Sequence, residues 1–348
     1  MKERIRQRAL ELGFEACRFT TASPPSSGPA FQNWLDAGWH GSMEYLARNA
    51  AKRKNPALVL PEARSVIVLA ASYYSEEPLA PCSQVDAGNG ANKGVVARYA
   101  RFNDYHEVLG TRLKTLCASI DALSPAGARS LWYVDTGPVL ERDLAQRAGL
   151  GFIGKHASLI SRQWGNWIFL AEILTPLELD PDAPEKNRCG RCARCIAACP
   201  TQAIRAPFTL DARRCIAYLT IEHKGSIPVE WRSAIGDRIF GCDDCLEACP
   251  WNRFAAVGRA MKGQARGGLA NPDLIELLGL DGAGFQERFR GTPVQRLKRA
   301  RLRRNVCVAL GNTGGREVLP QLERAAGDAD ALVVEHAAWA VERIRERG

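Results

Sequence analysis

Eight of the twelve cysteines in this 348-residue chain follow one another in two closely spaced groups. The first group is a C-x2-C-x2-C-x3-C-P run made of Cys189, Cys192, Cys195 and Cys199. The second group is Cys215, followed by Cys242, Cys245 and Cys249, with a proline after the last cysteine. Runs of this spacing hold iron–sulfur clusters through their thiolates. The pattern therefore predicts two [4Fe–4S] clusters, which accept and release single electrons.

The order of the cysteines also predicts which of them share a cluster. In bacterial proteins with two such clusters, the fourth cysteine of each run binds the other cluster. We therefore expect cluster 1 to be held by Cys189, Cys192, Cys195 and Cys249. Cluster 2 would be held by Cys199, Cys215, Cys242 and Cys245, with Cys215 in place of the missing first cysteine of the second run.

Two other uses of cysteine fit this pattern less well. Structural zinc sites use two pairs of ligands at finger or ribbon spacing, which leaves the triplet and its C-P ending unexplained. A disulfide framework is typical of short secreted chains. The remaining cysteines, Cys17, Cys82, Cys117 and Cys307, are isolated, and we expect buried or incidental thiols there.

The start of the chain has none of the features of an export signal. Residues 1–19 predict an amphipathic helix and a short strand, with no apolar export segment and no twin arginine. No stretch approaches the roughly 20 apolar residues of a membrane span. Together with the cysteines, this predicts a cytoplasmic protein that does not enter a membrane.

The positive charge of the chain is concentrated near its end. The formal net charge is +9, and a dense basic run is formed by Arg296, Lys298, Arg299, Arg301, Arg303 and Arg304. Such a run is a candidate surface for phosphate groups. A solvated helix face explains the same run equally well, so the charge alone does not decide between them.

Residues 1–185 predict an α/β domain in front of the clusters. Continuous apolar runs predict buried strands at 65–73, 130–134, 156–160 and 167–175. Helical periodicity covers 104–123, where Asp104 is suited to the N-cap, and 139–148, where Pro138 is suited to the first turn. This alternation favours an open sheet with helices packed on it.

The rest of the chain predicts a ferredoxin-like cluster domain and a helical tail. Residues 177–184 are expected to be a linker, 186–255 the cluster domain, and 256–270 a mobile loop within the last region, 256–348. In that region, 304–311 aligns with 335–341, which resembles a HEAT-like pair of helices. We expect these helices to pack on the cluster domain and to present a concave surface to a partner.

A two-electron reduction needs a second centre beside one-electron clusters. The chain has no G-x-G-x-x-G after a strand, so a flavin or nicotinamide fingerprint is missing. The segment 104–110 is similar to the D-x-H-x-x-G box that binds cobalamin cobalt from below, but Leu109 occupies its glycine position and the segment has a helical pattern. We therefore expect any corrinoid here to bind without His106 as its lower ligand.

Over nearly its whole length the chain resembles the epoxyqueuosine reductases, which act last in queuosine synthesis in tRNA. The resemblance rests on the two cysteine runs, the helical tail and the segments GWHGSMEYL (38–46), LPEARSVIV (60–68), RFNDYH (101–106), VDTGPVLER (134–142) and GFIGK (151–155). It implies two [4Fe–4S] clusters, a cobalamin that cluster 2 reduces, and a tRNA with epoxyqueuosine at the wobble position. It also implies a relation to corrinoid reductive dehalogenases.

The resemblance implies that Asp135 donates a proton to the opening epoxide. Cleavage of an epoxide leaves a developing alkoxide, which needs an acid within reach. Asp135 also follows a predicted strand, at the end where open sheets place ligands. The other role considered for Asp135 is the N-cap of the next helix. Tyr105 and His106 are further polar candidates near the substrate.

The same resemblance places cobalamin and tRNA contacts on this sequence. The implied cobalamin contacts are Arg53, Ala97, Asp135, Leu159, Leu170, Ala217, Lys224, Ile227, Cys242 and Asp243. Arg53 suits a corrin amide or phosphate, and Leu159, Leu170 and Ala217 would act through their backbone groups. The basic run 296–304 and the tail would hold tRNA phosphates, while the modified base enters the pocket.

Two rival functions remain open at this point. A corrinoid reductive dehalogenase usually carries a twin-arginine signal, which is missing here, and would not need a basic tail. A ferredoxin-like electron carrier leaves residues 1–185 unexplained. For the preferred function we expect a low-potential electron donor as a second partner, and a monomer that binds one tRNA.

Overall fold

An antiparallel sheet with strand order β1-β2-β7-β4 organises the first part of the chain. The computed structural model describes residues 1–75, 92–124 and 129–347. Every residue of β2 is buried and all but one of β7, which explains why both segments are almost continuously apolar. The strands are β1 (Ala16–Thr21), β2 (Ser65–Ser72), β4 (Leu131–Tyr133) and β7 (Ile168–Thr175).

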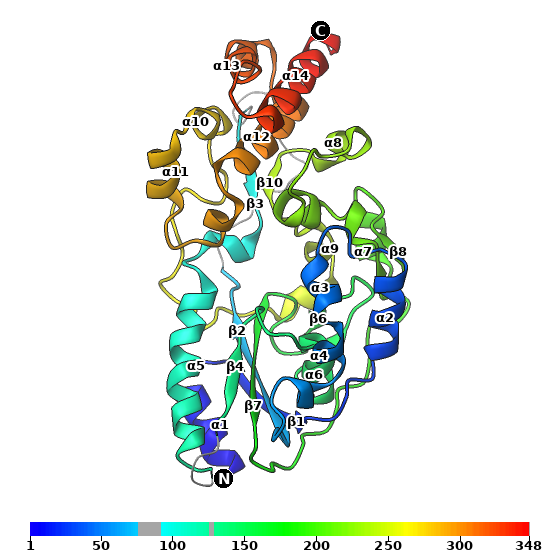
Figure 1. Cartoon of the computed structure of the whole chain (residues 1–348), viewed down its shortest axis with the longest axis vertical. Helices are drawn as coiled ribbons and strands as arrows, with labels where there is room; N and C mark the ends of the chain where they lie inside the picture. The colour runs from blue at the N-terminus through cyan, green and yellow to red at the C-terminus, as the bar shows by residue number, and fades with distance from the viewer. Residues whose placement is uncertain (76–91, 125–128, 348) are drawn as a thin grey trace.

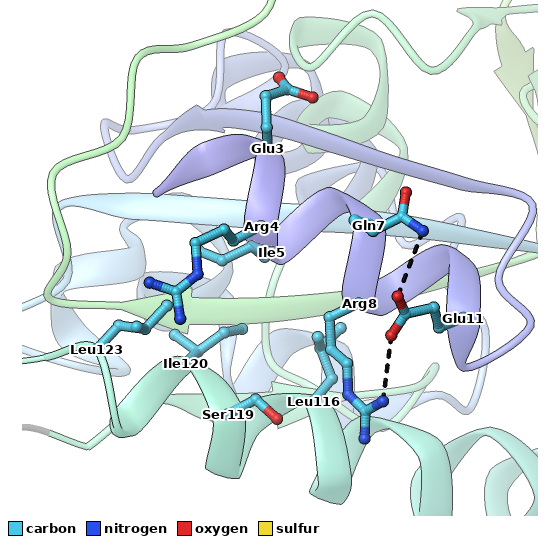
Figure 2. A pocket seen from close by; sticks show the side chains of 10 residues that line it. All are labelled: Glu3, Arg4, Ile5, Gln7, Arg8, Glu11, Leu116, Ser119, Ile120 and Leu123. Atoms are coloured by element: carbon cyan, nitrogen blue, oxygen red, sulfur yellow. Dashed lines mark hydrogen bonds and ion pairs between the residues drawn. The ribbon is translucent and has the colours of Figure 1, made fainter.

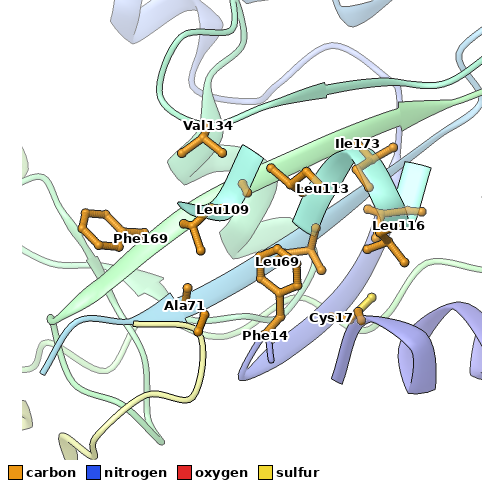
Figure 3. Close-up of a cluster of buried hydrophobic side chains, with 14 of the residues drawn as sticks. Phe14, Cys17, Leu69, Ala71, Leu109, Leu113, Leu116, Val134, Phe169 and Ile173 are labelled. Atoms are coloured by element: carbon orange, nitrogen blue, oxygen red, sulfur yellow. The ribbon is translucent and has the colours of Figure 1, made fainter. Parts of the chain in front are cut away.

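Helices cover both faces of this sheet. On one face, α1 (Lys2–Glu11) and α5 (Tyr105–Asp121) enclose a core that includes Phe14, Leu69 and Leu113 (Figure 3). On the other face, α6 (Glu141–Arg147) packs Leu144 and neighbouring alanines against the apolar side of β2. The prediction of an open sheet covered by helices is therefore confirmed.

Local details of the prediction differ from the structure at several points. The predicted strand 156–160 contributes only β6 (Leu159–Ile160), which pairs with β5 (Phe152–Ile153) outside the main sheet. Helix α6 begins two residues later than predicted, so Pro138 lies before its first turn. Asp104 caps α5 as predicted, because its carboxylate accepts a hydrogen bond from the backbone N–H of His106.

The segments predicted as linker and mobile loop are anchored to the first domain. Leu177 and Leu179 are buried in the core beneath α5. Ala260 and Met261 reach the same core, and Arg259 donates to the backbone carbonyl of Phe14. The predicted linker is therefore part of the core of the first domain, and part of the predicted loop 256–270 packs on that domain.

The remaining elements complete the first part of the chain and form the cluster region and the tail (Figure 1). Strand β3 of the first part pairs in parallel with β10 of the cluster region. None of the helices in the described ranges is long and apolar enough to cross a membrane. The elements are α2 (Gly28–Asp36), α3 (Glu44–Arg48), α4 (Ala50–Lys54), β3 (Val95–Val96), α7 (Arg194–Ala198), β8 (Ile204–Ala206), β9 (Thr209–Leu210), α8 (Val229–Ile235), β10 (Arg238–Phe240), α9 (Asp244–Glu247), α10 (Leu274–Gly279), α11 (Gly282–Phe289), α12 (Arg299–Thr313), α13 (Leu319–Ala325) and α14 (Ala331–Glu346).

The two aligned segments of the tail lie in α12 and α14, which pack against each other. Arg304 on α12 is fully buried and donates to the carbonyls of Leu219, His223 and Gly225. Burial of its guanidinium lowers the pKa of Arg304 to about 9. The prediction that the tail packs on the cluster region is confirmed, and Arg304 is one of the residues that hold the two together.

Burial also corrects part of the predicted tRNA surface. Arg303 is buried and donates to the carbonyl of Leu278 and to Asp328, and Arg304 is committed to the carbonyls above. Neither side chain can reach a phosphate on the surface, so assigning them as tRNA contacts is wrong. Arg296 and Lys298 are exposed, and Arg299 and Arg301 are half-buried.

Candidate redox and substrate site

The structure brings the eight cysteines together as two sets of four. In the first set, the Cys195 thiol interacts with Cys189 and Cys249, and Cys249 interacts with Cys192. In the second set, Cys215 interacts with Cys199, and both Cys242 and Cys245 interact with Cys215. These neighbours agree with the crossed pattern, while the assignment of each cysteine to a cluster stays a prediction. Cys17, Cys117 and Cys307 are buried, and Cys82 lies outside the described residues.

The cysteine thiols of the two sets are buried or half-buried and lie close to one another. Burial and the neighbouring cysteines raise the pKa of Cys215 and Cys249, and they raise the pKa of Cys245 well above its ordinary value. Four crowded thiolates repel one another unless metal compensates their charge. In the described ranges, no three His, Cys, Asp or Glu side chains converge tightly enough for a single metal ion. Two sets of four sulfurs at this sequence spacing suit two [4Fe–4S] clusters.

A cavity of about 240 Å³ lies next to the cluster 2 cysteines. Leu246, the residue after Cys245, forms part of its wall, together with Leu159 and Leu170 from the list of expected contacts. The Tyr105 and Phe169 rings in the same wall are stacked, with centroids 4.2 Å apart. The cavity therefore combines flat aromatic walls with a residue that directly follows the proposed cluster 2 ligand Cys245.

Asp135 lies at the edge of this cavity, in the turn between β4 and α6. Its φ of +58° is uncommon for a residue with a side chain, and such strained positions concentrate at functional sites. Gly137 makes the turn possible, because a Cβ there would collide with the Tyr133 ring. The N-cap of α6 is Leu140, so Asp135 does not cap that helix. The sheet is antiparallel, so the ligand-site rule for parallel sheets does not explain the position of Asp135.

Two side chains of α5 face the Asp135 carboxylate. The Tyr105 hydroxyl donates to Asp135 Oδ2 over 2.7 Å, and His106 Nε2 lies 3.9 Å from the same oxygen. His106 Nδ1 lies 2.6 Å from Asp104 Oδ1, which fixes the direction of the ring. Arg296 from the tail reaches this group, with Nε 3.8 Å from Asp104 Oδ2. The predicted proton donor, both polar candidates and one predicted tRNA contact therefore lie together.

Two carboxyl groups near the cavity were not predicted. Glu172 on β7 is fully buried, and neither of its carboxyl oxygens has a hydrogen-bond partner in the described structure. Glu141 accepts a hydrogen bond from the backbone N–H of Asp135. Burial, helped by the charge of Asp135, raises the pKa of Glu141 to about 8, and burial raises the pKa of Glu172 well above its ordinary value. The one sequence signal was a single glutamate within the apolar run 167–175.

The other expected cofactor contacts divide into three groups. Arg53 donates to the carbonyl of Val139 over 3.0 Å, close to the Asp135 turn. Ala97 and Asp243 lie side by side, since Arg98, which follows Ala97, donates its N–H to Asp243 over 2.6 Å. Ala217 precedes a short π-helix, Tyr218–Glu222, and Lys224 after it is exposed.

Ile227 does not fit its predicted role. Its side chain is fully buried in a core with Ile216, Ile235 and Val308. Its N–H donates to His336 Nε2, and its carbonyl accepts from Arg232. The expectation that Ile227 contacts a cofactor is therefore corrected, because its side chain and both backbone groups are already engaged within the protein.

Unpaired polar atoms around the cavity test whether a cofactor fits. Arg53 Nε, His106 Nε2, Glu141 Oε1 and Asn166 Oδ1 are buried without a hydrogen-bond partner in the described part of the chain. Buried polar atoms rarely stay unpaired in native proteins. These atoms include hydrogen-bond donors and hydrogen-bond acceptors. The amide side chains around a corrin ring need both, because each amide has an N–H group that donates and an oxygen that accepts. The residues therefore fit a flat cofactor with a polar rim.

A second hollow, of about 500 Å³, lies between α1 and α5 and away from the predicted site residues (Figure 2). Its floor includes Ile5, Leu116 and Ile120, and Glu11 on its rim accepts hydrogen bonds from Gln7 and Arg8. None of the predicted site residues lines it, so it is not part of the candidate site.

Comparisons with known proteins agree with this geometry. Residues 188–252 match the family model described as a 4Fe-4S double cluster binding domain, and residues 53–136 match the model described as epoxyqueuosine reductase QueG, DUF1730. The epoxyqueuosine reductase of Vibrio cholerae is 40% identical over 350 residues, covering 100% of this chain and 93% of that protein.

Two solved structures are similar over almost the whole chain. A crystal structure of epoxyqueuosine reductase with an epoxyqueuosine-modified tRNA-Tyr stem loop has a TM-score of 0.90 and 31% identity, covering 99% of this chain and 90% of that one. The Bacillus subtilis enzyme, with its catalytic aspartate loop swung out of the active site, has a TM-score of 0.89 and 30% identity, also covering 99% and 90%.

Proposed function

This chain belongs to the epoxyqueuosine reductase family, and we propose that it reduces epoxyqueuosine to queuosine at the wobble position of tRNA. The observation that carries the proposal is the position of Asp135. Its carboxylate lies at the edge of a cavity that also touches the segment of cluster 2. An acid and a source of electrons therefore meet at one place, as reductive opening of an epoxide requires.

The reaction consumes two electrons and two protons, and it converts the epoxide into an alkene and water. Bound cobalamin would supply a strongly reducing cobalt centre to the carbon side of the C–O bond. Asp135 would give a proton to the oxygen that leaves carbon. Its side chain is 63% exposed, so the protein alone does not exclude water from it. We propose that substrate and cofactor complete that enclosure.

The neighbours of Asp135 orient its carboxyl group. The Tyr105 hydroxyl holds Oδ2, and the Glu141 carboxyl holds the backbone N–H of Asp135 itself. His106, turned by Asp104, adds a nitrogen at the same edge. These contacts support the strained turn, with its acid at the edge of the cavity.

The finer assignments are also proposals. Cobalamin would be held by Arg53, by backbone groups near Leu159, Leu170 and Ala217, and on the cluster 2 side by Ala97, Cys242, Asp243 and Lys224. The exposed or half-buried part of the basic run, with Arg296 nearest to the cavity, would contact tRNA phosphates. The helices α12 and α14 would act as a HEAT-like support for one tRNA bound to a monomer.

The test uses anaerobically reconstituted protein with both clusters and cobalamin. It is incubated with epoxyqueuosine-containing tRNA and dithionite, and the nucleosides are read by mass spectrometry. Wild-type protein should produce queuosine, with loss of one oxygen. Asp135→Asn should stop conversion while clusters and cofactor stay bound, because asparagine adopts a positive φ as readily as aspartate. No conversion by fully loaded wild-type protein would refute the proposal.

A further inference from the structure

We propose that the loop 186–194 and the hollow beside it form a docking surface for a small acidic one-electron carrier protein, which delivers electrons to cluster 1. The inference rests on the proposed function, because that reaction consumes electrons that the chain does not make. Beyond that function, the inference names the place where the electrons enter the molecule and the charge of the donor protein.

The position of the loop makes cluster 1 the entry point. Cys189 and Cys192 are only partly buried, and the residues between and around them are exposed. Cluster 2 instead adjoins the inner cavity through Leu246. Cys245 of cluster 2 also interacts with Cys195 of cluster 1, so the two sets are neighbours. An electron that arrives from outside therefore meets cluster 1 first and then passes inward.

The charge of the loop fits an acidic partner. Residues 186–194 contain four cations, Lys186, Arg188, Arg191 and Arg194, and no acid. All four side chains are exposed. Arg188 is paired with Glu185, but in the described part of the chain Lys186, Arg191 and Arg194 make no ion pair. Cations left unpaired in this way attract an anionic surface and speed its association.

A hollow of about 420 Å³ adjoins the loop and adds apolar contact area. Its wall includes Arg162, Arg188, Trp251 and Phe254. The Trp251 ring packs against Phe254, with centroids 5.6 Å apart, and lies in the same side-chain cluster as Cys189 and Cys249. Phe254 is 39% exposed. An aromatic contact thus leads from the surface to two proposed ligands of cluster 1, beside Arg162 and Arg188, which both pair with Glu185 in the same wall.

A carrier protein explains this surface better than a second part of the tRNA site. Phosphate contacts alone would not need the exposed aromatic ring, and the proposed tRNA contact nearest to the substrate cavity is Arg296, on the tail. Weak electron-transfer complexes use small interfaces steered by charge, which matches a short basic loop beside one hollow.

The electron balance is one electron for each docking event. A reduced carrier gives one electron to oxidised cluster 1 and leaves oxidised. Two such events provide the two electrons that, with two protons, convert the epoxide into alkene and water. Because the cobalt centre of the proposed reaction is strongly reducing, the carrier must be a low-potential donor, such as a plant-type ferredoxin.

The test compares two double variants of the reconstituted holoenzyme. Arg191→Glu with Arg194→Glu reverses the charge of the loop. Arg4→Glu with Lys114→Glu makes the same change in net charge at exposed positions of α1 and α5, where neither residue has an ion pair in the described structure. Iron content is measured first, so that only variants with both clusters are compared.

The probe is an acidic plant-type ferredoxin. Its affinity for the holoenzyme is measured by calorimetry at low and high salt, and its rate of cluster reduction by stopped flow. The loop variant should bind the ferredoxin at least tenfold more weakly and lose most of the salt dependence, while the control variant stays within twofold of wild type. In both variants, the rate of conversion with dithionite should stay unchanged. The Kd for tRNA should stay unchanged as well.

Equal ferredoxin affinity in the loop variant and wild type would overturn the proposal. So would an equal loss in the loop and control variants, or a loss of tRNA affinity in place of ferredoxin affinity, which would assign the surface to nucleic acid. Failure of the proposed function is separate, because it would appear as no dithionite-driven conversion by wild type, whatever the ferredoxin affinity.

Discussion

The Tyr105 hydroxyl on α5 donates a 2.7 Å hydrogen bond to Asp135 Oδ2, in a turn 30 residues further along the chain. Burial, followed by the charge of Asp135, raises the pKa of Tyr105 far above its ordinary value, so the hydroxyl keeps its proton. Its ring stacks on Phe169 of β7, which limits its movement. The sheet thus positions Tyr105, and Tyr105 positions the acid.

Replacing Tyr105 by phenylalanine removes this hydrogen bond and keeps the ring. We expect Tyr105→Phe to lower kcat about tenfold, or about 1.4 kcal/mol in the barrier, with little change in the KM for tRNA. Single-turnover conversion under dithionite measures this. Tyr99→Phe is the matched control, because Tyr99 lines the same cavity and its hydroxyl makes no hydrogen bond among the described residues. Equal effects of the two variants would contradict an orienting role for Tyr105.

The exposed residues of the basic run are expected to contribute to tRNA affinity. Arg296 and Lys298 are exposed, so each should contribute to phosphate contacts. Removing either should weaken tRNA binding and reduce the slope of log K against log salt by about 0.7 to 0.9. Affinities of Arg296→Ala and Lys298→Ala, measured at several salt concentrations, check this. An unchanged slope in both variants would show that the phosphates bind elsewhere.

Arg304 should behave differently from these two residues. Arg304→Met would leave the carbonyls of Leu219, His223 and Gly225 without their donor, at about 1–3 kcal/mol for each group that remains buried and unpaired. We therefore expect a loss of several kcal/mol in the free energy of unfolding, seen as a lower midpoint in urea. Arg299→Met, at a half-buried position on the same helix, is the control. A variant as stable as wild type would refute the anchoring role.

Arg303 and Arg304 are buried whereas Arg296 and Lys298 are exposed, and the sequence did not predict this difference. Spacing predicted the two cysteine sets, because cluster ligation depends on short intervals along the chain. Apolar runs predicted β2 and β7, because burial on both faces leaves a simple pattern. The basic run does not indicate which of its arginines are buried, because a guanidinium can donate hydrogen bonds to buried carbonyls as well as to phosphates. Only the packing of α12 on residues 219–225 separates these two uses.

The sequence indicated the candidate acid Asp135 but not the carboxyl groups near it or the antiparallel order of the sheet. Asp135 was predicted from its motif and its position after a strand. Glu172 was missed, because a lone glutamate in a strand gives no indication of whether its carboxyl is paired. The antiparallel order of the sheet was missed as well, because it depends on long-range pairing, which periodicity does not encode.

The crossed cysteine sets make a prediction about cluster content. Cys199 belongs to the first run in sequence but lies with Cys215 and Cys245 in space. Cys199→Ala should therefore disturb the same cluster as Cys245→Ala, while Cys249→Ala should disturb the other one. Electron paramagnetic resonance of the reduced proteins distinguishes the two cases. If the spectrum of Cys199→Ala matched that of Cys249→Ala, the crossed assignment would fail.

The raised pKa of the buried Glu172 carboxyl should make the stability of the protein depend on pH. Its pKa in the folded protein is raised by burial, whereas in the unfolded chain it is near the ordinary value of about 4.3. Below that value the carboxyl is protonated in both states, and its neutral form carries no charge penalty. As pH rises, the unfolded chain releases the proton while the folded protein retains it, so stability falls by up to about 1.4 kcal/mol per pH unit. The fall stops only when the folded carboxyl ionises too.

Glu172→Gln removes this dependence and keeps the shape of the side chain. The variant should already be more stable than wild type at pH 5.5 and exceed it by a growing margin at higher pH, up to the pKa of the folded Glu172 carboxyl, measured as anaerobic melting temperature between pH 5.5 and 8.5. Glu141, whose pKa is about 8, is present in both proteins, and its charge helps to raise the pKa of Glu172, so the difference between the two curves measures Glu172 together with this interaction. Glu178→Gln is the control, because the Glu178 side chain is 80% exposed. Parallel curves for Glu172→Gln and wild type would mean that the Glu172 carboxyl is paired in solution, contrary to its position in β7.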